Sequence, residues 1–361
     1  MTMLEIGAQI SLLQGLWLVL AAVLWIGFFF LEGFDFGVGM LIVFLGRTDR
    51  ERRLVINTIG PVWDGNEVWL VTAGGAMLAA FPGWYATLFS ALYLPLLLVL
   101  VGLILRGVAF EYRGKNPSPT WRTRWDWCAT IGSLIVSLVF GIGFANLLLG
   151  LPVTTTSTAL GSAPLYSGTF LGLFSPLGLI GGLLFVALFL THGAVFIALK
   201  THGEIHTRAE ALAVISGLVT LALLAVFVVW GNLLTVLPGQ LPGLRTSAWA
   251  LGIAAVVCVA AAVWCARQGR EGLAFLGTGV AIITMVAMIF LHLYPGLGFD
   301  NTAIIAAGGQ PLDVTTASSS PRTLTIMSVA AAVTLPVVLG YQFWTYRVFR
   351  RRLSLESIPG A

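Results

Sequence analysis

Nine predominantly apolar stretches, each about 20 residues long, follow one another along this chain. An α-helix needs about this length to cross the hydrocarbon core of a bilayer. Because 58% of the residues are hydrophobic and only 9% are charged, the chain has too little polar surface to cover a water-soluble globule. We therefore expect an all-α integral membrane protein, a bundle of nine transmembrane helices. The predicted spans begin near Leu12, Leu54, Tyr85, Cys128, Phe170, Ala209, Ser247, Gly272 and Leu324.

Lysine and arginine are concentrated in alternate connections between these spans. Of the 19 basic residues, 17 lie in residues 47–53, 106–124, 200–208, 267–270 and 347–352, and the others are Arg245 and Arg322. Since basic residues accumulate on the cytoplasmic side of membrane proteins, the asymmetry predicts an N-terminus outside and a cytoplasmic C-terminus. It also explains the basic charge balance of the chain without a nucleic-acid partner.

The chain is predicted to be a single polytopic transmembrane domain covering residues 1–361. Spans one to four fall in about 10–150, spans five to nine in about 168–348, and a cytoplasmic tail in 349–361. Two longer connections on the outer side, 151–166 and 298–322, are rich in Gly, Ser, Thr and Pro. We expect both to form irregular caps over the bundle.

Four carboxylates interrupt the first two predicted spans: Glu32, Asp35, Asp64 and Glu67. A charge at the centre of a membrane helix costs about 2.5–3.5 kcal/mol, so such acids are usually kept for proton relays, ion pathways or paired sites. The helical rise places Asp35 and Asp64 about 17 Å from the nearest basic flank, and Glu32 and Glu67 about 22 Å.

These depths predict a ladder of acids near the middle of the membrane. The loop between the first two spans is short, so the spans should be antiparallel neighbours, and i, i+3 spacing places both acids of each span on one face. The two spans offer no basic partner, and close carboxylates in a low dielectric hold protons, which suits a relay. Asn57, seven residues before Asp64, would form its cytoplasmic entrance. The alternative is that the acids only hydrogen-bond buried partners and specify packing.

The four histidines give no pattern typical of a metal or haem site. His202 and His206 flank Glu204 at i, i+4 spacing, but no further acid–histidine motif follows, so we expect no bound metal. His192 and His292 lie in different predicted spans without paired spacing. We expect them to be hydrogen-bonded core residues rather than axial haem ligands.

Several long motifs resemble subunit II of the cytochrome bd quinol oxidases, the family that includes the cyanide-insensitive oxidases. The resemblance is specific over roughly the first 150 residues and weaker afterwards. The motifs are EGFDFGVGML at 32–41, NTIGPVWDGNEVWL at 57–70, TAGGA at 72–76, FPGWYA at 81–86, FEYRGK at 110–115 and GAVFIALK at 193–200.

The resemblance implies a division of labour within a membrane complex. The partner, subunit I, would carry haems b558, b595 and d and the quinol site, whereas this chain would hold no redox centre. A proton path through this chain would include Asp64, whose neighbour Trp63 completes the family's Trp-Asp motif, and Asp35 of its Gly-Phe-Asp motif. Trp63 is also a candidate for an oxygen channel or a structural role. Glu32 and Glu67 stand where other members have Asp and Gln, which puts the charge at Glu67 in doubt.

We therefore predict the haem-free subunit of a quinol:oxygen oxidoreductase in the bacterial cytoplasmic membrane. The complex would oxidise quinol, reduce dioxygen to water with cytoplasmic protons, and separate charge without pumping. Small single-helix accessory subunits and a structural quinone or lipid are further candidates for partners. The alternative from another class is a proton-coupled secondary transporter, but transporters usually show interrupted helices in corresponding halves. A purely structural subunit is a third interpretation.

Overall fold

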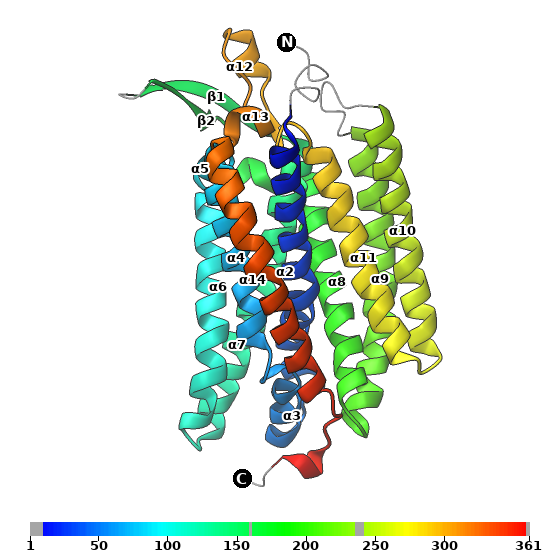
Figure 1. The fold of residues 1–361 in the computed structure, drawn as a ribbon. Helices are drawn as coiled ribbons and strands as arrows, with labels where there is room; N and C mark the ends of the chain where they lie inside the picture. The colour runs from blue at the N-terminus through cyan, green and yellow to red at the C-terminus, as the bar shows by residue number, and fades with distance from the viewer. Residues whose placement is uncertain (1–9, 159–160, 235–241, 359–361) are drawn as a thin grey trace.

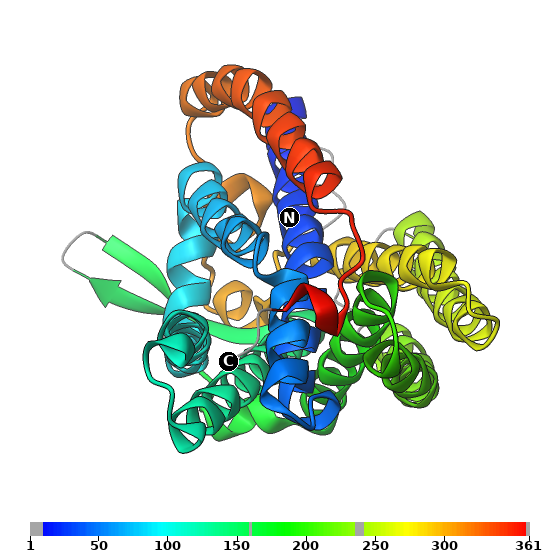
Figure 2. The same ribbon diagram turned by 90° about the horizontal axis from the view of Figure 1, so that it is seen from below.

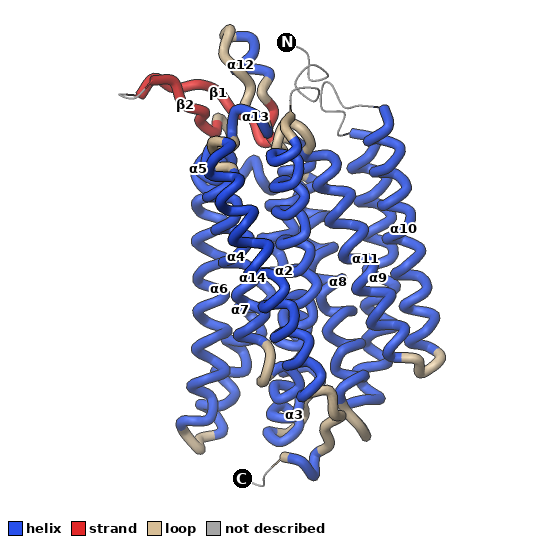
Figure 3. The backbone as a smooth tube through the Cα atoms, viewed as in Figure 1, coloured by secondary structure: helices blue, strands red, loops and turns tan. Residues whose placement is uncertain are grey.

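The computed structural model describes residues 10–158, 161–234 and 242–358, and most of these lie in long helices (Figures 1 and 3). Within these ranges, eight helices are long and apolar enough to cross a membrane. They are α2 (Leu12–Leu45), α6 (Tyr93–Tyr112), α7 (Pro119–Leu149), α8 (Pro176–Lys200), α9 (Glu204–Leu234), α10 (Pro242–Arg267), α11 (Glu271–Leu293) and α14 (Pro321–Val348). The prediction of a helical membrane protein is therefore confirmed.

The second predicted span is not one continuous helix. It is divided into α3 (Asp49–Ile59) and α4 (Trp63–Ala80), with Gly60, Pro61 and Val62 between them. Proline lacks the backbone N–H that would continue a helix, and its ring clashes with the preceding turn. The break starts a new helix at Trp63, and α4 packs against α2 as the antiparallel arrangement predicted. The expectation of nine continuous transmembrane helices is therefore not confirmed for the second span.

The third predicted span also begins later than expected. The short helix α5 (Pro82–Ala91) comes first, and the membrane-length helix α6 starts at Tyr93 rather than near Tyr85. Proline occupies the first turn of α5, where its missing N–H costs nothing.

One end of the bundle carries a small sheet, and we call it the sheet end. Strands β1 (Leu151–Thr158) and β2 (Gly161–Tyr166) pair antiparallel, and β1 also pairs in parallel with β3 (Phe299–Asp300). A threonine-rich sequence in β1 favours an extended backbone. Two short helices, α12 (Thr302–Ala306) and α13 (Val314–Ala317), and the 3₁₀ turn Leu171–Phe174 complete this end. The expectation of irregular caps was wrong for 151–166, which forms a hairpin.

The opposite end, which we call the basic end, is held together by ion pairs. It contains α3, the turn after α6 (Arg113–Lys115) and the tail that follows α14, with its 3₁₀ turn Leu355–Ser357 (Figure 1). Asp126 of α7 accepts hydrogen bonds from Arg52 at 3.1 Å and Arg113 at 2.5 Å. Asp49 pairs with Arg113 at 2.7 Å. These bridges tie α3 to α6 and α7.

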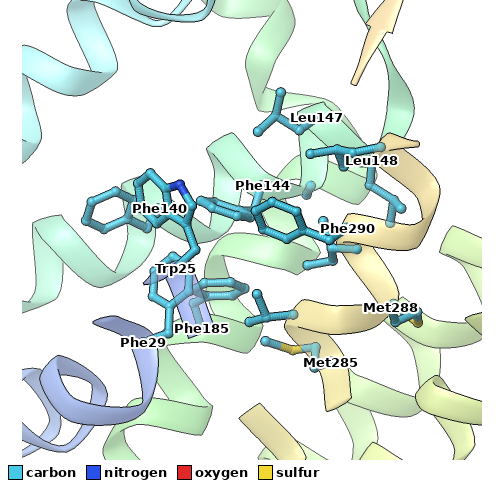
Figure 4. Packing of buried hydrophobic residues seen from close by; sticks show 14 of the residues in the cluster. Trp25, Phe29, Phe140, Phe144, Leu147, Leu148, Phe185, Met285, Met288 and Phe290 are labelled. Atoms are coloured by element: carbon cyan, nitrogen blue, oxygen red, sulfur yellow. The ribbon is translucent and has the colours of Figure 1, made fainter. Parts of the chain in front are cut away.

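Aromatic packing fixes α2 in the centre of the bundle (Figure 4). Phe29 lies edge-on to Phe144 of α7, with ring centroids 4.9 Å apart, and to Phe185 of α8 at 5.2 Å. Trp25, one turn earlier, contacts Phe144 at 5.1 Å. Such pairs stabilise by about 0.5–1.5 kcal/mol each beyond their buried area. They hold the segment that carries the acids at a fixed rotation.

Two glycines let α2 and α8 approach until their backbones touch. A Cβ atom at Gly37 would lie 1.9 Å from the carbonyl oxygen of Phe189, and one at Gly193 would lie 2.5 Å from the carbonyl carbon of Gly37. Neither position can accept a larger residue without separating the helices.

Candidate functional site

Glu32 and Arg106 form an ion pair inside the bundle. The Arg106 Nη1 atom donates to Glu32 Oε2 at 2.6 Å, and both side chains are fully buried. Arg106 belongs to α6, so its assignment to a cytoplasmic loop was wrong, and the acids do have a basic partner, supplied by a third helix. Its guanidinium lies 4.8 Å from the ring centroid of Phe36 and 5.8 Å from that of Trp63, distances typical of cation–π contact.

Asn66 connects the second buried acid to the last long helix. Its Nδ2 donates to Asp35 Oδ2 at 2.7 Å, and its Oδ1 accepts from Tyr346 Oη and from Gln342 Nε2, both at 2.9 Å. Gln342 and Tyr346 are one turn apart on α14, so both reach the same amide. Asn66 and Asp35 are buried. One amide therefore links α2, α4 and α14.

The predicted four-acid ladder is only partly formed. Glu32 and Asp35 are buried, Glu67 is half-buried, and Asp64 is exposed on the surface of the chain. Glu67 interacts electrostatically with the two buried acids and also with Asp64. The matched tiers were wrong because the break before Trp63 changes the course of the helix, so Asn66 rather than Asp64 faces Asp35.

Asp64 lies in the first turn of α4. A negative charge there is favoured by the unpaired N–H groups of the helix start. The break thus places the Asp64 side chain at the start of a helix.

A cavity of about 630 Å³ leads from the basic end toward Tyr346. Exposed Asn57 lies on its wall. Phe30, Phe34 and Phe275 form apolar walls. The basic-end residues lining it are Lys200, Arg350, Arg351 and Arg352. Tyr346, whose hydroxyl donates to Asn66, is among the residues that line the cavity.

Several buried atoms of the two acids and of Arg106 have no hydrogen-bond partner within the described ranges. They are Glu32 Oε1, Asp35 Oδ1, and Arg106 Nε and Nη2. Buried polar atoms are normally paired, with protein or with ordered water. The cluster therefore offers both donors and acceptors for bridging water between the two acids.

The buried histidines use their ring nitrogens within the chain. His192 Nε2 lies 3.2 Å from the carbonyl oxygen of Phe30, its Nδ1 lies 2.7 Å from Thr278 Oγ1, and its ring stacks on Phe275. His292 Nε2 lies 3.0 Å from Asn232 Oδ1. Both ring nitrogens of His192 are therefore engaged within the chain.

A second cavity, of about 700 Å³, is almost entirely apolar. It lies among α4, α5, α6 and α7, and its walls include Trp84, Tyr85, Phe89, Phe140 and Phe290. Its size and lining fit an acyl or isoprenoid chain.

Sequence reasoning missed Asn66, Arg106 and Tyr346. Asn66 stands inside the quoted 57–70 motif but is uncharged, so a search for charged residues in apolar spans passed over it. Pro61 in that motif could have revealed the break that directs Asn66 inward. The contact between Asn66 and Tyr346 joins positions 280 residues apart and has no local signature.

Comparison with known proteins agrees with this architecture. The chain matches the cytochrome bd terminal oxidase subunit II family over residues 13–349. It is 40% identical over 343 residues to cytochrome bd ubiquinol oxidase subunit 2 of Bacillus subtilis (strain 168), covering 95% of this chain and 97% of that protein. It is 36% identical over 374 residues to cytochrome bd-I ubiquinol oxidase subunit 2 of Escherichia coli (strain K12), covering 96% and 97%.

A solved structure supports the fold independently. A chain of the bd oxidase from Geobacillus thermodenitrificans superposes with a TM-score of 0.71 at 20% identity, covering 94% of this chain and 99% of that one. The family match spans nearly all of the chain, and the curated relatives are aligned over almost their whole length. The chain belongs to the cytochrome bd terminal oxidase subunit II family.

Proposed function

We propose that this chain is the haem-free subunit of a bd-type quinol oxidase and conducts protons from the cytoplasm toward the oxygen-reducing centre of subunit I. The haems b558, b595 and d and the quinol site would belong to that partner. The complex would be electrogenic through the separate sides of quinol oxidation and proton uptake. The observation that carries the proposal is the hydrogen-bonded row Tyr346–Asn66–Asp35, which starts at the cavity of the basic end.

The proposed path runs from the basic end to Asp64. Protons enter through the cavity beside Asn57 and reach Tyr346. Asn66 holds the Tyr346 hydroxyl and the Asp35 carboxylate in place and does not itself carry the proton, because a neutral amide does not do so readily. Water at the unpartnered oxygens of Asp35 and Glu32 would carry the proton to the two acids. Arg106 keeps Glu32 in place, and Glu67 lies between the buried pair and Asp64. Asp64 delivers the proton to the partner.

The proposed orientation places the basic end in the cytoplasm. Arg106 lies inside α6 and is no longer counted as a loop residue. The other 16 basic residues of 47–53, 106–124, 200–208, 267–270 and 347–352 remain on the side that the positive-inside rule assigns to the cytoplasm. The helix α2 then begins on the outer side and α14 ends in the cytoplasm, in the inner membrane of a bacterium.

The outer surface of α4 and α14 is the proposed docking surface for subunit I. In the most apolar 18-residue stretch of α14, only 6% of the residues are buried, whereas 78% are buried in the corresponding stretch of α8. Figure 2 shows α14 at the periphery of the bundle. Asp64, Val68 and Thr72 are exposed on α4. A carboxylate facing lipid near the membrane centre costs about 2.5–3.5 kcal/mol, whereas burial in a polar contact with a partner avoids this cost.

A proton-coupled transporter is not favoured, because the chain belongs to an oxidase family over nearly its whole length. The broken second span also has no matching break in the other described long helices, apart from Pro336 within α14. The interpretation that the acids only hold helices together makes a different prediction, which the following experiment addresses.

The test is the rate of proton uptake by the purified complex during a single turnover with oxygen. Tyr346→Phe removes one hydroxyl at the inner end of the cavity and keeps the ring. The matched control is Tyr112→Phe, an exposed tyrosine at the end of α6. We expect uptake to slow at least about tenfold in Tyr346→Phe at normal haem content, and to be unchanged in the control. Unchanged uptake in an assembled Tyr346→Phe complex would contradict the proposed path.

A further inference from the structure

Three side chains of types that bind metal ions meet at the basic end. They do not include Glu32, Asp35, Asp64 or Glu67. His206 and Glu210 lie one turn apart in the first turns of α9, and Glu271 begins α11. His206 Nε2 is 3.4 Å from Glu210 Oε2 and 3.5 Å from Glu271 Oε1, and the three ligand atoms all lie within 4.8 Å of one another. The sequence predicted no bound metal at His202 and His206, and exposed His202 is not part of the trio.

The orientation of His206 directs a lone pair at the two carboxylates. Its Nδ1 lies 2.9 Å from the carbonyl oxygen of Ala198, and a carbonyl only accepts, so Nδ1 carries the proton. In the neutral ring, Nε2 then presents a lone pair to two carboxylate oxygens, an arrangement that a metal ion between them would stabilise. Hydrogen bonding of the remote ring nitrogen to a backbone carbonyl is also how proteins orient histidine ligands of metals.

We propose that His206, Glu210 and Glu271 bind a divalent transition-metal ion of the Zn²⁺ class. Zinc binds histidine nitrogen and carboxylate oxygen at about 2.0–2.2 Å, so neighbouring ligands of a tetrahedral ion lie about 3.3–3.6 Å apart. The two distances from His206 already match that spacing. The trio of one imidazole and two carboxylates supplies three ligands, and the fourth position stays open to water.

The surroundings of the trio meet two further requirements of a metal site. The three side chains are between 14% and 26% exposed, so an ion can enter from solvent. Arg352 of the tail lies 3.4 Å from Glu271 Oε2, the oxygen that does not face His206. This contact fixes the carboxylate with Oε1 toward the trio, although the charge of Arg352 also offsets part of the attraction for a cation.

A bound ion would connect four parts of the chain at the basic end. It would join α9 to α11 directly, α8 through the Ala198 carbonyl, and the C-terminal tail through Arg352. The site is therefore a structural clamp, and none of the acids of the proposed proton path belongs to it. The competing explanation is a protonated His206 held between two carboxylates, with no metal involved.

Zinc binding to the purified complex distinguishes the two explanations. The complex is stripped with a chelator and dialysed against micromolar Zn²⁺, and bound metal is compared between wild type, His206→Gln and Glu210→Gln. The control is His202→Gln, an exposed histidine of the same loop. Wild type and the control should bind one more equivalent than the two variants, whose affinity should fall at least about tenfold. Subtracting the zinc content of the variant complexes from that of the wild-type complex removes the contribution of zinc bound by any other subunit.

A second measurement applies if a variant does not assemble. X-ray absorption of the wild-type complex should show Zn²⁺ bound by nitrogen and oxygen at about 2.0–2.1 Å, without sulfur. Zinc should also raise the thermal midpoint of the wild-type complex more than that of Glu210→Gln. Equal zinc uptake by wild type and His206→Gln, or no uptake by wild type at micromolar zinc, overturns the proposal.

Discussion

The Asn66 Nδ2 atom donates a 2.7 Å hydrogen bond to Asp35 Oδ2 in the interior of the bundle. The opposite side of the same amide accepts two hydrogen bonds from α14, so Asn66 stabilises the fold and also determines what the acid contacts. The mostly exposed helix α14 is attached to the bundle centre through the Asn66 amide. Packing and the proposed proton path therefore depend on the same side chain.

Replacing Asn66 with leucine should destabilise the complex. The change leaves the Asp35 carboxylate and the Tyr346 hydroxyl without their partner, and each buried group left unpaired costs about 1–3 kcal/mol. We expect a lower thermal midpoint, measured by fluorescence of the complex in detergent. Asn57→Leu, at an exposed position, is the control. Equal midpoints for both variants would show that the amide contributes nothing to stability.

Replacing Arg106 with glutamine should be among the most damaging changes in the chain. Breaking a buried ion pair leaves an uncompensated charge and costs about 3–5 kcal/mol. Arg106→Gln should reduce the yield of assembled complex, and Arg106→Gln with Glu32→Gln should restore part of it, since no charge is then left unpaired. Arg124→Gln, at an exposed arginine, should behave as wild type. If the double variant gives no higher yield of assembled complex than Arg106→Gln alone, the result would argue against an ion pair between Arg106 and Glu32.

The membrane-crossing helices could be predicted because apolar runs of sufficient length have few other stable states. The acids could be found because a carboxylate in such a run is costly and therefore conspicuous. Asn66 and Tyr346 carry no formal charge, so the same reasoning passed over them. Arg106 was misassigned because a basic residue near the end of an apolar run resembles a loop anchor until a buried acid from another helix is known to face it.

The division of the second span was predictable in principle, whereas its consequence was not. Pro61 after Gly60 marks a helix end, but the direction in which α4 resumes depends on packing against α2 and α14. That direction decides that Asn66 faces inward and Asp64 outward. Similarly, the hairpin at 151–166 depends on pairing between strands, which composition alone does not reveal.

The ion pairs of the basic end should make stability depend on pH. Burial disfavours the charge of Asp49, but hydrogen bonds and charges from Arg113, with Arg122 and Arg53, outweigh it and lower the pKa of Asp49. A lowered pKa gives stability that is present above the unfolded-state pKa, about 3.9, and is lost as pH falls through the folded pKa.

Asp49→Asn tests this dependence. Since the Asp49 side chain is 33% exposed, we expect its loss to cost only about 1 kcal/mol at neutral pH. The difference in thermal midpoint from wild type should shrink below about pH 4. Glu356→Gln, at an exposed acid of the same end, should show no such pH-dependent difference. A difference that stays constant across this range would mean that the Asp49 charge is not responsible.

The orientation can be tested with single cysteines at the two ends of the bundle. In a background with Cys128, Cys258 and Cys265 replaced by alanine, Glu356→Cys at the basic end should react with a membrane-impermeant thiol reagent only after the membrane is opened. Ala306→Cys at the sheet end should react in intact cells. Both positions are exposed on the chain. The reverse pattern would overturn the proposed topology.

Asp64→Asn tests the exit of the proposed path. The substitution keeps the shape of the side chain and its place in the first turn of α4 but removes a proton-accepting group. If Asp64 passes protons to subunit I, the assembled variant should contain haem d normally yet take up protons at least about tenfold more slowly. Glu111→Gln, at an exposed acid on α6, should leave uptake unchanged. If Asp64 serves docking alone, activity should fall only as far as assembly does, with normal turnover per remaining haem d. Normal proton-uptake kinetics in the assembled Asp64→Asn complex would therefore remove Asp64 from the path and leave it a contact residue.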